Sequence, residues 1–177
     1  MILRVLTLAA GLTGAIGLSQ FPAFSQQYQQ RLGGAVDELT RVVAQFDRDA
    51  ASVGLDRASA LSELDSGGAF GAARAASMSQ TIARHVRLQA DLAALEGAGP
   101  FMRARLAGHL GDRDIAARAW EAFEPSVPAT FEGAVFAGTG FVGGWALVSM
   151  LAGLLGGLIR RPVRRLSRQP AMAARNS

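Results

Sequence analysis

The chain has 177 residues, of which 50% are hydrophobic, a formal net charge of +4 and no cysteine. This length leaves room for one modest domain beside membrane segments and argues against a large enzyme, while the lack of cysteine excludes disulfides, thiolate chemistry and cysteine-ligated metals. Every basic residue is an arginine, and residues 19–131 hold 11 arginines against 13 acidic residues, which argues against a nucleic-acid-binding surface.

The first apolar stretch covers residues 2–18 and is interrupted only by Arg4, which is close enough to the end to reach the lipid headgroups. Two interpretations are open: a membrane anchor, or a signal peptide with a small-x-small cleavage site at residues 23–25. Small residues four apart suit close helix packing in a bilayer and favour the anchor. They form the series Ala9, Thr13 and Gly17 and the pair Gly11 and Ala15.

A heptad-like pattern of apolar residues follows, with alternating spacings of four and three residues. Its members are Leu32, Val36, Leu39, Val43, Phe46, Ala50 and Val53. This spacing predicts an amphipathic helix that ends at Gly54. The apolar stripe is either the seam of an intramolecular bundle or the interface of a homodimeric coiled coil, and its short length favours the bundle.

Further helices are predicted up to residue 123. They comprise a short turn over residues 56–64, a long helix over residues 70–96, and two short helices over residues 101–110 and 115–123. The long helix has an apolar side formed by Met78, Ile82, Val86, Leu88, Leu92 and Leu95. Asp112 is the expected N-cap of the last short helix, whose apolar side holds Ile115, Ala119, Trp120 and Phe123. No segment alternates long enough to predict a strand.

The second apolar stretch, residues 133–159, contains 27 consecutive residues without a charge. As a helix it would be about 40 Å long, enough to cross a hydrocarbon core of about 30 Å. Arginines follow at once: Arg160, Arg161, Arg164, Arg165 and Arg168. Such a cluster holds its end of a span in the cytoplasm and also attracts anionic lipid headgroups, and we favour the role in orientation.

Small residues four apart recur within this second stretch. Gly140 and Gly144 form one pair, Gly153 and Gly157 form another, and Ser149 lies one turn before the second pair. Such spacing lets helix backbones approach closely in lipid. The sequence therefore predicts a packing face for the first span, for another membrane protein or for a second copy of the chain.

No catalytic, cofactor or metal site is predicted. His85 and His109 are on different predicted elements, and a site made from His109 with Asp112 and Asp114 lacks the spacing of a helical ligand pair. The glycine-rich residues 67–71 are not followed by the Lys-Ser or Lys-Thr of a phosphate loop, and no serine stands in a Gly-x-Ser-x-Gly turn.

Three segments carry a resemblance to a known group of proteins: LSQFPAFSQQY at residues 18–28, GAVDEL at residues 34–39, and FEPSVP at residues 123–128. They resemble an uncharacterised family of short proteobacterial two-pass membrane proteins, catalogued as a domain of unknown function. The similarity covers nearly the whole chain up to residue 159, and the arginine tail is least typical. The resemblance implies a Gram-negative inner membrane and assigns no functional residue.

The sequence thus predicts an all-α protein in which two transmembrane helices flank a periplasmic helical bundle or helical hairpin. Its predicted parts are an anchor or signal peptide (1–24), a periplasmic helical domain (25–130), a transmembrane helix (131–159) and a basic cytoplasmic tail (160–177). The predicted function is a non-enzymatic inner-membrane accessory or scaffold protein without a cofactor, acting by helix association. The alternative is a ligand-sensing periplasmic module that signals through a partner, and a membrane-bound hydrolase is least favoured.

Overall fold

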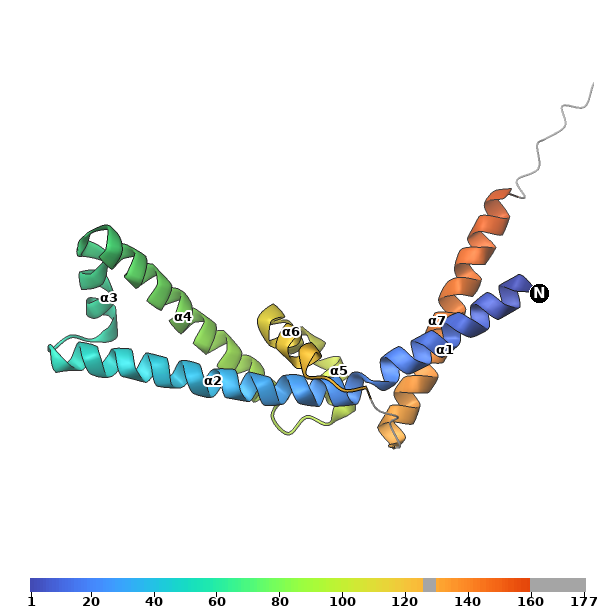
Figure 1. Ribbon diagram of the computed structural model, residues 1–177, viewed down its shortest axis with the longest axis horizontal. Coiled ribbons are helices and arrows are strands. Elements are labelled where there is room, and N and C mark those ends of the chain that lie inside the picture. Colours follow the sequence, from blue (N-terminus) through green and yellow to red (C-terminus); the bar gives the residue numbers. More distant parts are fainter. Residues whose placement is uncertain (126–129, 160–177) are drawn as a thin grey trace, which may run out of the picture.

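A computed structural model describes residues 1–125 and 130–159 of the chain. Within these ranges all regular structure is helical, with helices α1 to α7, one 3-10 turn and no strand (Figure 1). The predicted all-α class is confirmed, as are two long apolar helices at the two ends of the sequence with a helical region between them.

The apolar helices are α1 (Ile2–Ser19) and α7 (Phe131–Ile159). Their 18 and 29 residues correspond to about 27 and 44 Å. The helical stretches long and apolar enough to cross a membrane are Ile2–Ser52, which begins with α1, and Phe131–Leu155 within α7. Large apolar side chains cover their outer surfaces. The most exposed are Ile2, Val5 and Ile16 on α1, and Phe131, Val142 and Leu155 on α7. A surface this apolar is unfavourable in water and ordinary in lipid, so it indicates a membrane location.

Helix α2 (Phe21–Ser52) follows α1 after the single residue Gln20. Pro22 has no backbone N–H to donate, and its ring clashes with the carbonyl group four residues earlier in a continuous helix. The helix is therefore interrupted here. The chain bends at this point and α2 then leads away from the apolar pair (Figure 1). At 32 residues, α2 extends for about 48 Å.

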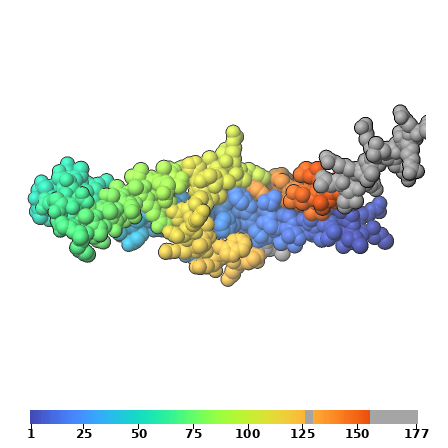
Figure 2. All heavy atoms as spheres, turned by 90° about the horizontal axis from the view of Figure 1, so that it is seen from above, coloured from blue at the N-terminus to red at the C-terminus, as the bar shows by residue number. Residues whose placement is uncertain are grey.

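Helix α2 forms an arm together with α3 (Arg57–Ser66) and α4 (Gly68–Leu95). Gly54, with φ of 79°, provides the left-handed residue that ends α2, and the predicted short turn is a full helix capped by the side chain of Asp56. Helix α3 lies between α2 and α4 at the far end of the arm, and α4 returns obliquely toward the base, where it meets α2 (Figures 1 and 2).

Three short elements lie at the base of the arm, close to the apolar pair: α5 (Pro100–Arg105), the 3-10 turn η1 (Ala107–Leu110) and α6 (Arg113–Glu121). The helix predicted over residues 101–110 is therefore divided in two. Helix α6 begins at the expected cap, where the side chain of Asp112 accepts a hydrogen bond from the backbone N–H of Ile115.

The hydrophobic core lies where α2, α4 and α6 meet at the base of the arm. Its buried members are Tyr28, Leu32, Val36, Leu88, Leu95, Ile115 and Ala119. Three predicted apolar-side residues are instead exposed: Val53 (70%), Val86 (60%) and Trp120 (69%). Val86 precedes the buried Leu88 by two positions and so points to the opposite side of α4. Trp120 packs against two aromatic rings, those of Phe24 and Phe123.

Candidate functional site

The closest contact between the two apolar helices is made by glycines. A Cβ added at Gly14 of α1 would overlap the carbonyl oxygen of Gly140 of α7, and a Cβ at Gly140 would overlap the carbonyl oxygen of Gly14. A Cβ at Gly144 would in the same way overlap the carbonyl oxygen of Ala10. The helix backbones touch here, and side chains would force them apart.

The direction of the two helices follows from this contact. Position 10 lies against position 144, and position 14 against position 140, so α1 and α7 are antiparallel. Further along, the rings of Phe21 and Phe136 lie with their centroids 5.2 Å apart, which continues the same register. The start of α1 and the end of α7 are consequently on the same side of the pair (Figure 1).

The structure brings only some of the predicted packing residues together. Gly140 and Gly144 lie against α1, and Ser149 is half-buried. A Cβ added at Gly153 would meet no atom within 4 Å, because the antiparallel register leaves this part of α7 beyond the start of α1. Gly157 belongs to α7, but its surroundings lie outside the described residues.

The five arginines of the predicted basic cluster, Arg160, Arg161, Arg164, Arg165 and Arg168, also lie outside the described residues. Their role in orientation or in lipid contact stays a prediction, as does any packing of Gly153 and Gly157 against another protein.

On α1, the sequence pointed to two series of small residues, and one of them faces outward. Ala9 and Thr13 are exposed, and a Cβ at Gly17 would meet nothing within 4 Å. Gly11 lies in the contact, where an added Cβ would be 2.8 Å from the Phe141 ring. Gly14 is also in the contact although sequence reasoning missed it, and its separation of four residues from Ala10 is the signal that could have found it.

A polar network surrounds the start of α6 at the base of the arm. The Asp112 carboxylate accepts from Arg84, with Nη2 and Oδ1 3.0 Å apart, and lies 3.5 Å from Arg87 Nη2. Arg84 also pairs with Asp114 at 3.3 Å. The Asp112 side chain is only 7% exposed, so these cations balance a charge that has lost most of its water.

Tyr28 joins this network to the core. Its ring is fully buried, and its hydroxyl oxygen accepts a hydrogen bond of 3.0 Å from the backbone N–H of Asp112. Burial raises the pKa of Tyr28 above its ordinary value, with a smaller opposing effect from this hydrogen bond. The network fixes the position of α6 on α2 and α4.

The two histidines make separate local contacts. His85 Nε2 lies 2.8 Å from Thr40 Oγ1, and His109 Nδ1 lies 2.7 Å from Asp91 Oδ1. Of the acids that the sequence placed near His109, Asp112 and Asp114 pair with arginines instead. Among residues 1–125 and 130–159, no group of three or more His, Asp or Glu side chains is placed to hold a metal ion.

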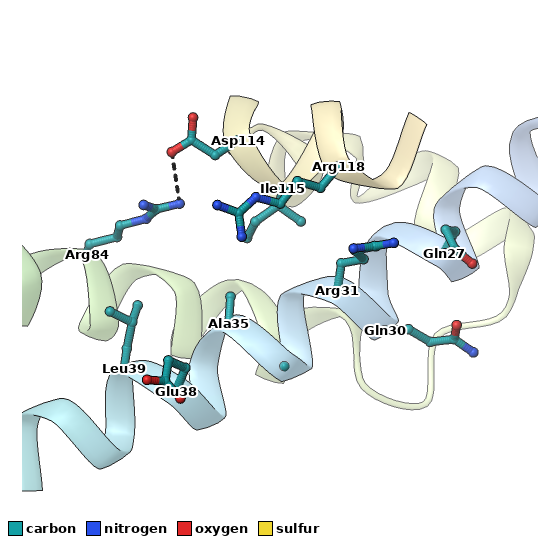
Figure 3. A pocket seen from close by; sticks show the side chains of 11 residues that line it. Gln27, Gln30, Arg31, Ala35, Glu38, Leu39, Arg84, Asp114, Ile115 and Arg118 are labelled. Carbon is teal, nitrogen blue, oxygen red and sulfur yellow. Dashed lines mark ion pairs between the residues drawn. The ribbon is translucent and has the colours of Figure 1, made fainter. Parts of the chain in front are cut away.

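A groove of about 550 Å³ runs beside the polar network, between α2, α4 and α6. Figure 3 shows Arg31, Arg84 and Arg118 gathered around it from the three helices, with Glu38 and Asp114 at its edges. Three cations against two carboxylates give the groove a small excess of positive charge. Such a lining suits a small anion, although the Arg84 guanidinium is already paired.

A family model described as "Protein of unknown function (DUF2937)" matches residues 2–161, which is nearly the whole chain. No curated protein and no solved structure is detectably similar to the chain. The match confirms the resemblance to an uncharacterised family.

Proposed function

The chain belongs to the DUF2937 family of unknown function, and we propose that it is a non-enzymatic scaffold of the bacterial inner membrane. In this proposal α1 is a retained anchor that spans the bilayer beside α7, both termini are cytoplasmic, and the arm stands in the periplasm. Helix association in the membrane holds the arm, and the arm presents a contact surface to an envelope protein.

The observation that supports this role most is the shape of the arm. Helix α2 leads about 48 Å away from the apolar pair, and the exposed apolar side chain of Val53 follows directly after it. Phe70 is 85% exposed at the start of α4, at the same far end of the arm. Exposed apolar side chains at the end of a long helical projection suit contact with another protein.

The glycine contact supports retention of α1 in the mature protein. A cleaved signal peptide has no need to match a second span, whereas Gly14 and Gly140 fit each other at backbone distance. The pair also connects directly to the arm, because only Gln20 separates α1 from α2.

Photo-crosslinking in intact cells tests the scaffold role. A photoreactive residue at Phe70 or Val53 is expected to give a discrete adduct with an envelope protein, because these side chains are exposed at the end of the arm. A photoreactive residue at Arg113, which is exposed at the base of the arm, is the matched control. Equal labelling from the control, or no discrete adduct from either end position, would contradict the proposal.

A second candidate function is ligand sensing through the groove of Figure 3, signalled through a partner protein. The three arginines that line the groove favour this candidate. Saturable binding of a di- or tricarboxylate by the full chain, lost in Arg118→Gln, would support sensing. No saturable binding would leave the scaffold role as the better explanation.

A further inference from the structure

A second cavity, of about 300 Å³, lies where α1, α2, α5 and α7 come together. Its polar lining consists of Ser19, Gln20, Gln26, Arg103, Thr130 and Glu132. Ser19 is the last residue of α1, and Glu132 lies in the first turn of α7. The cavity is therefore at the boundary between the apolar pair and the polar arm, which is the depth of lipid headgroups if the pair spans a bilayer.

Arg103 is the unusual residue of this cavity. The residue is only 8% exposed, and its Nε and Nη1 atoms are buried with no hydrogen-bond partner among the described residues. Burial lowers the pKa of Arg103, but a guanidinium remains charged at neutral pH. A buried cation without a partner is costly, so this position favours an anion within reach of the guanidinium.

Aromatic packing holds Arg103 in place. Phe101, two residues before it on α5, stacks on Phe136 of α7 with ring centroids 5.5 Å apart, and Phe136 also contacts Phe21 of α2. Helix α5 thus contacts both α2 and the start of α7, and Arg103 is buried beside this contact.

Glu132 gives the cavity a second charge of opposite sign. Its carboxylate belongs to the first turn of α7, whose backbone N–H of Gly133 is capped by the hydroxyl of Thr130 at 3.1 Å. No ion pair joins Arg103 to Glu132 in the part of the chain that the structure describes. A ligand that carries both a negative and a positive group would satisfy both side chains.

We propose that this cavity binds the headgroup of an aminophospholipid, with the phosphate at Arg103 and the primary ammonium at Glu132. The proposal rests on the proposed two-pass arrangement, because it requires the cavity to face the outer headgroup layer of the membrane. A guanidinium matches a phosphodiester through charge-assisted hydrogen bonds, and a primary ammonium has N–H groups to donate to a carboxylate. The lipid would brace the junction between arm and membrane.

Native mass spectrometry of the detergent-solubilised full chain, titrated with single lipids, tests the proposal. The lipids are phosphatidylethanolamine, phosphatidylcholine, whose quaternary amine has no N–H, and phosphatidylglycerol, which has no amine. The wild type is expected to bind phosphatidylethanolamine about tenfold more tightly than either of the others. Arg103→Gln is expected to lose about tenfold in affinity for phosphatidylethanolamine, while Arg105→Gln, an exposed arginine on the same helix, keeps it.

Glu132→Gln keeps the arginine and removes only the partner of the amine. It is expected to bind all three lipids about equally, a change of preference that a merely unfolded variant would not produce. Equal affinity in Arg103→Gln and Arg105→Gln, or an unchanged preference in Glu132→Gln, would overturn the proposal. Displacement of the lipid by millimolar inorganic phosphate would also overturn it, since the site would then be one for a soluble anion.

Thiol labelling of Phe70→Cys and Ser177→Cys in whole cells separates this proposal from the proposed function. In the two-pass arrangement an impermeant thiol reagent labels Phe70→Cys and does not reach Ser177→Cys in closed cells. If that pattern is found and Arg103→Gln binds lipid as tightly as the wild type, only the lipid site is rejected. Labelling that contradicts the two-pass arrangement would reject the proposed function itself.

Discussion

Gly14 of α1 and Gly140 of α7 face each other with their backbones in contact, so neither position has room for a Cβ. Replacing either residue by Leu is expected to separate the helices and weaken their association by about 1–3 kcal/mol, because the added side chain has no space to occupy. A cysteine pair at Phe21 and Phe136, whose rings are 5.2 Å apart, reports on the contact through a short thiol crosslinker. The crosslinked fraction is expected to fall in Gly14→Leu.

Two glycines serve as matched controls for this experiment. Gly17 is on the same helix as Gly14, and Gly153 is on the same helix as Gly140, yet a Cβ at either position would meet nothing within 4 Å. Gly17→Leu and Gly153→Leu are expected to leave the crosslinked fraction unchanged. If Gly14→Leu crosslinks as well as Gly17→Leu, the glycine contact does not hold the pair together.

Leu88 of α4 is fully buried in the hydrophobic core, whereas Val86 on the same helix is 60% exposed. Leu88→Ala is expected to destabilise the arm by about 2–5 kcal/mol, since the lost methyl groups leave a cavity in the core. Val86→Ala is expected to change stability by less than about 0.5 kcal/mol. Thermal unfolding of the full chain followed by circular dichroism measures both, and equal melting temperatures for the two variants would show that the core is elsewhere.

Tyr28 is expected to make stability depend on pH in the alkaline range. Because burial raises the folded-state pKa of Tyr28, the neutral phenol stabilises the fold below pH of about 10, and this contribution is lost as pH rises through the folded-state pKa. Tyr28→Phe is expected to be less stable by about 1 kcal/mol at neutral pH, because the N–H of Asp112 loses its acceptor. Above pH of about 10 only the wild type is expected to lose stability further.

The composition makes this titration easy to interpret. The chain has one tyrosine, no lysine and no cysteine, so no other phenol, amine or thiol side chain has an ordinary pKa in the alkaline range. Unfolding free energies of the wild type and Tyr28→Phe across this range give the comparison. Parallel curves for the two proteins would contradict the assigned environment of Tyr28.

The helical parts of the fold were predictable because local signals are strong in this chain. Alternating spacings of four and three residues marked the buried stripe of α2, and Gly54 marked its end. The exposure of Val86 and Trp120 was not predictable, because the side of a helix that is buried depends on the partner that packs there, and the sequence does not name the partner.

The candidate sites show the same division between local and tertiary information. Spacing alone identified Gly140 and Gly144 as small residues suited to packing, but the antiparallel register decides that Gly14 is used and that Gly153 is left open. Arg103 carries no sequence signal at all. It is buried on α5, which packs against α2 and contacts α7 through Phe101 and Phe136, and these contacts join distant parts of the chain.

The most direct test of the two-pass arrangement is thiol labelling of single-cysteine variants, since the natural chain has no cysteine that would react. Phe70→Cys places a thiol at the far end of the arm, where the side chain is 85% exposed, and Ser177→Cys places one at the end of the chain. In cells with a permeabilised outer membrane, a membrane-impermeant maleimide is expected to label Phe70→Cys at once and Ser177→Cys only after the inner membrane is opened. Labelling of Ser177→Cys in closed cells, or protection of Phe70→Cys, would contradict a periplasmic arm held by two membrane-spanning helices.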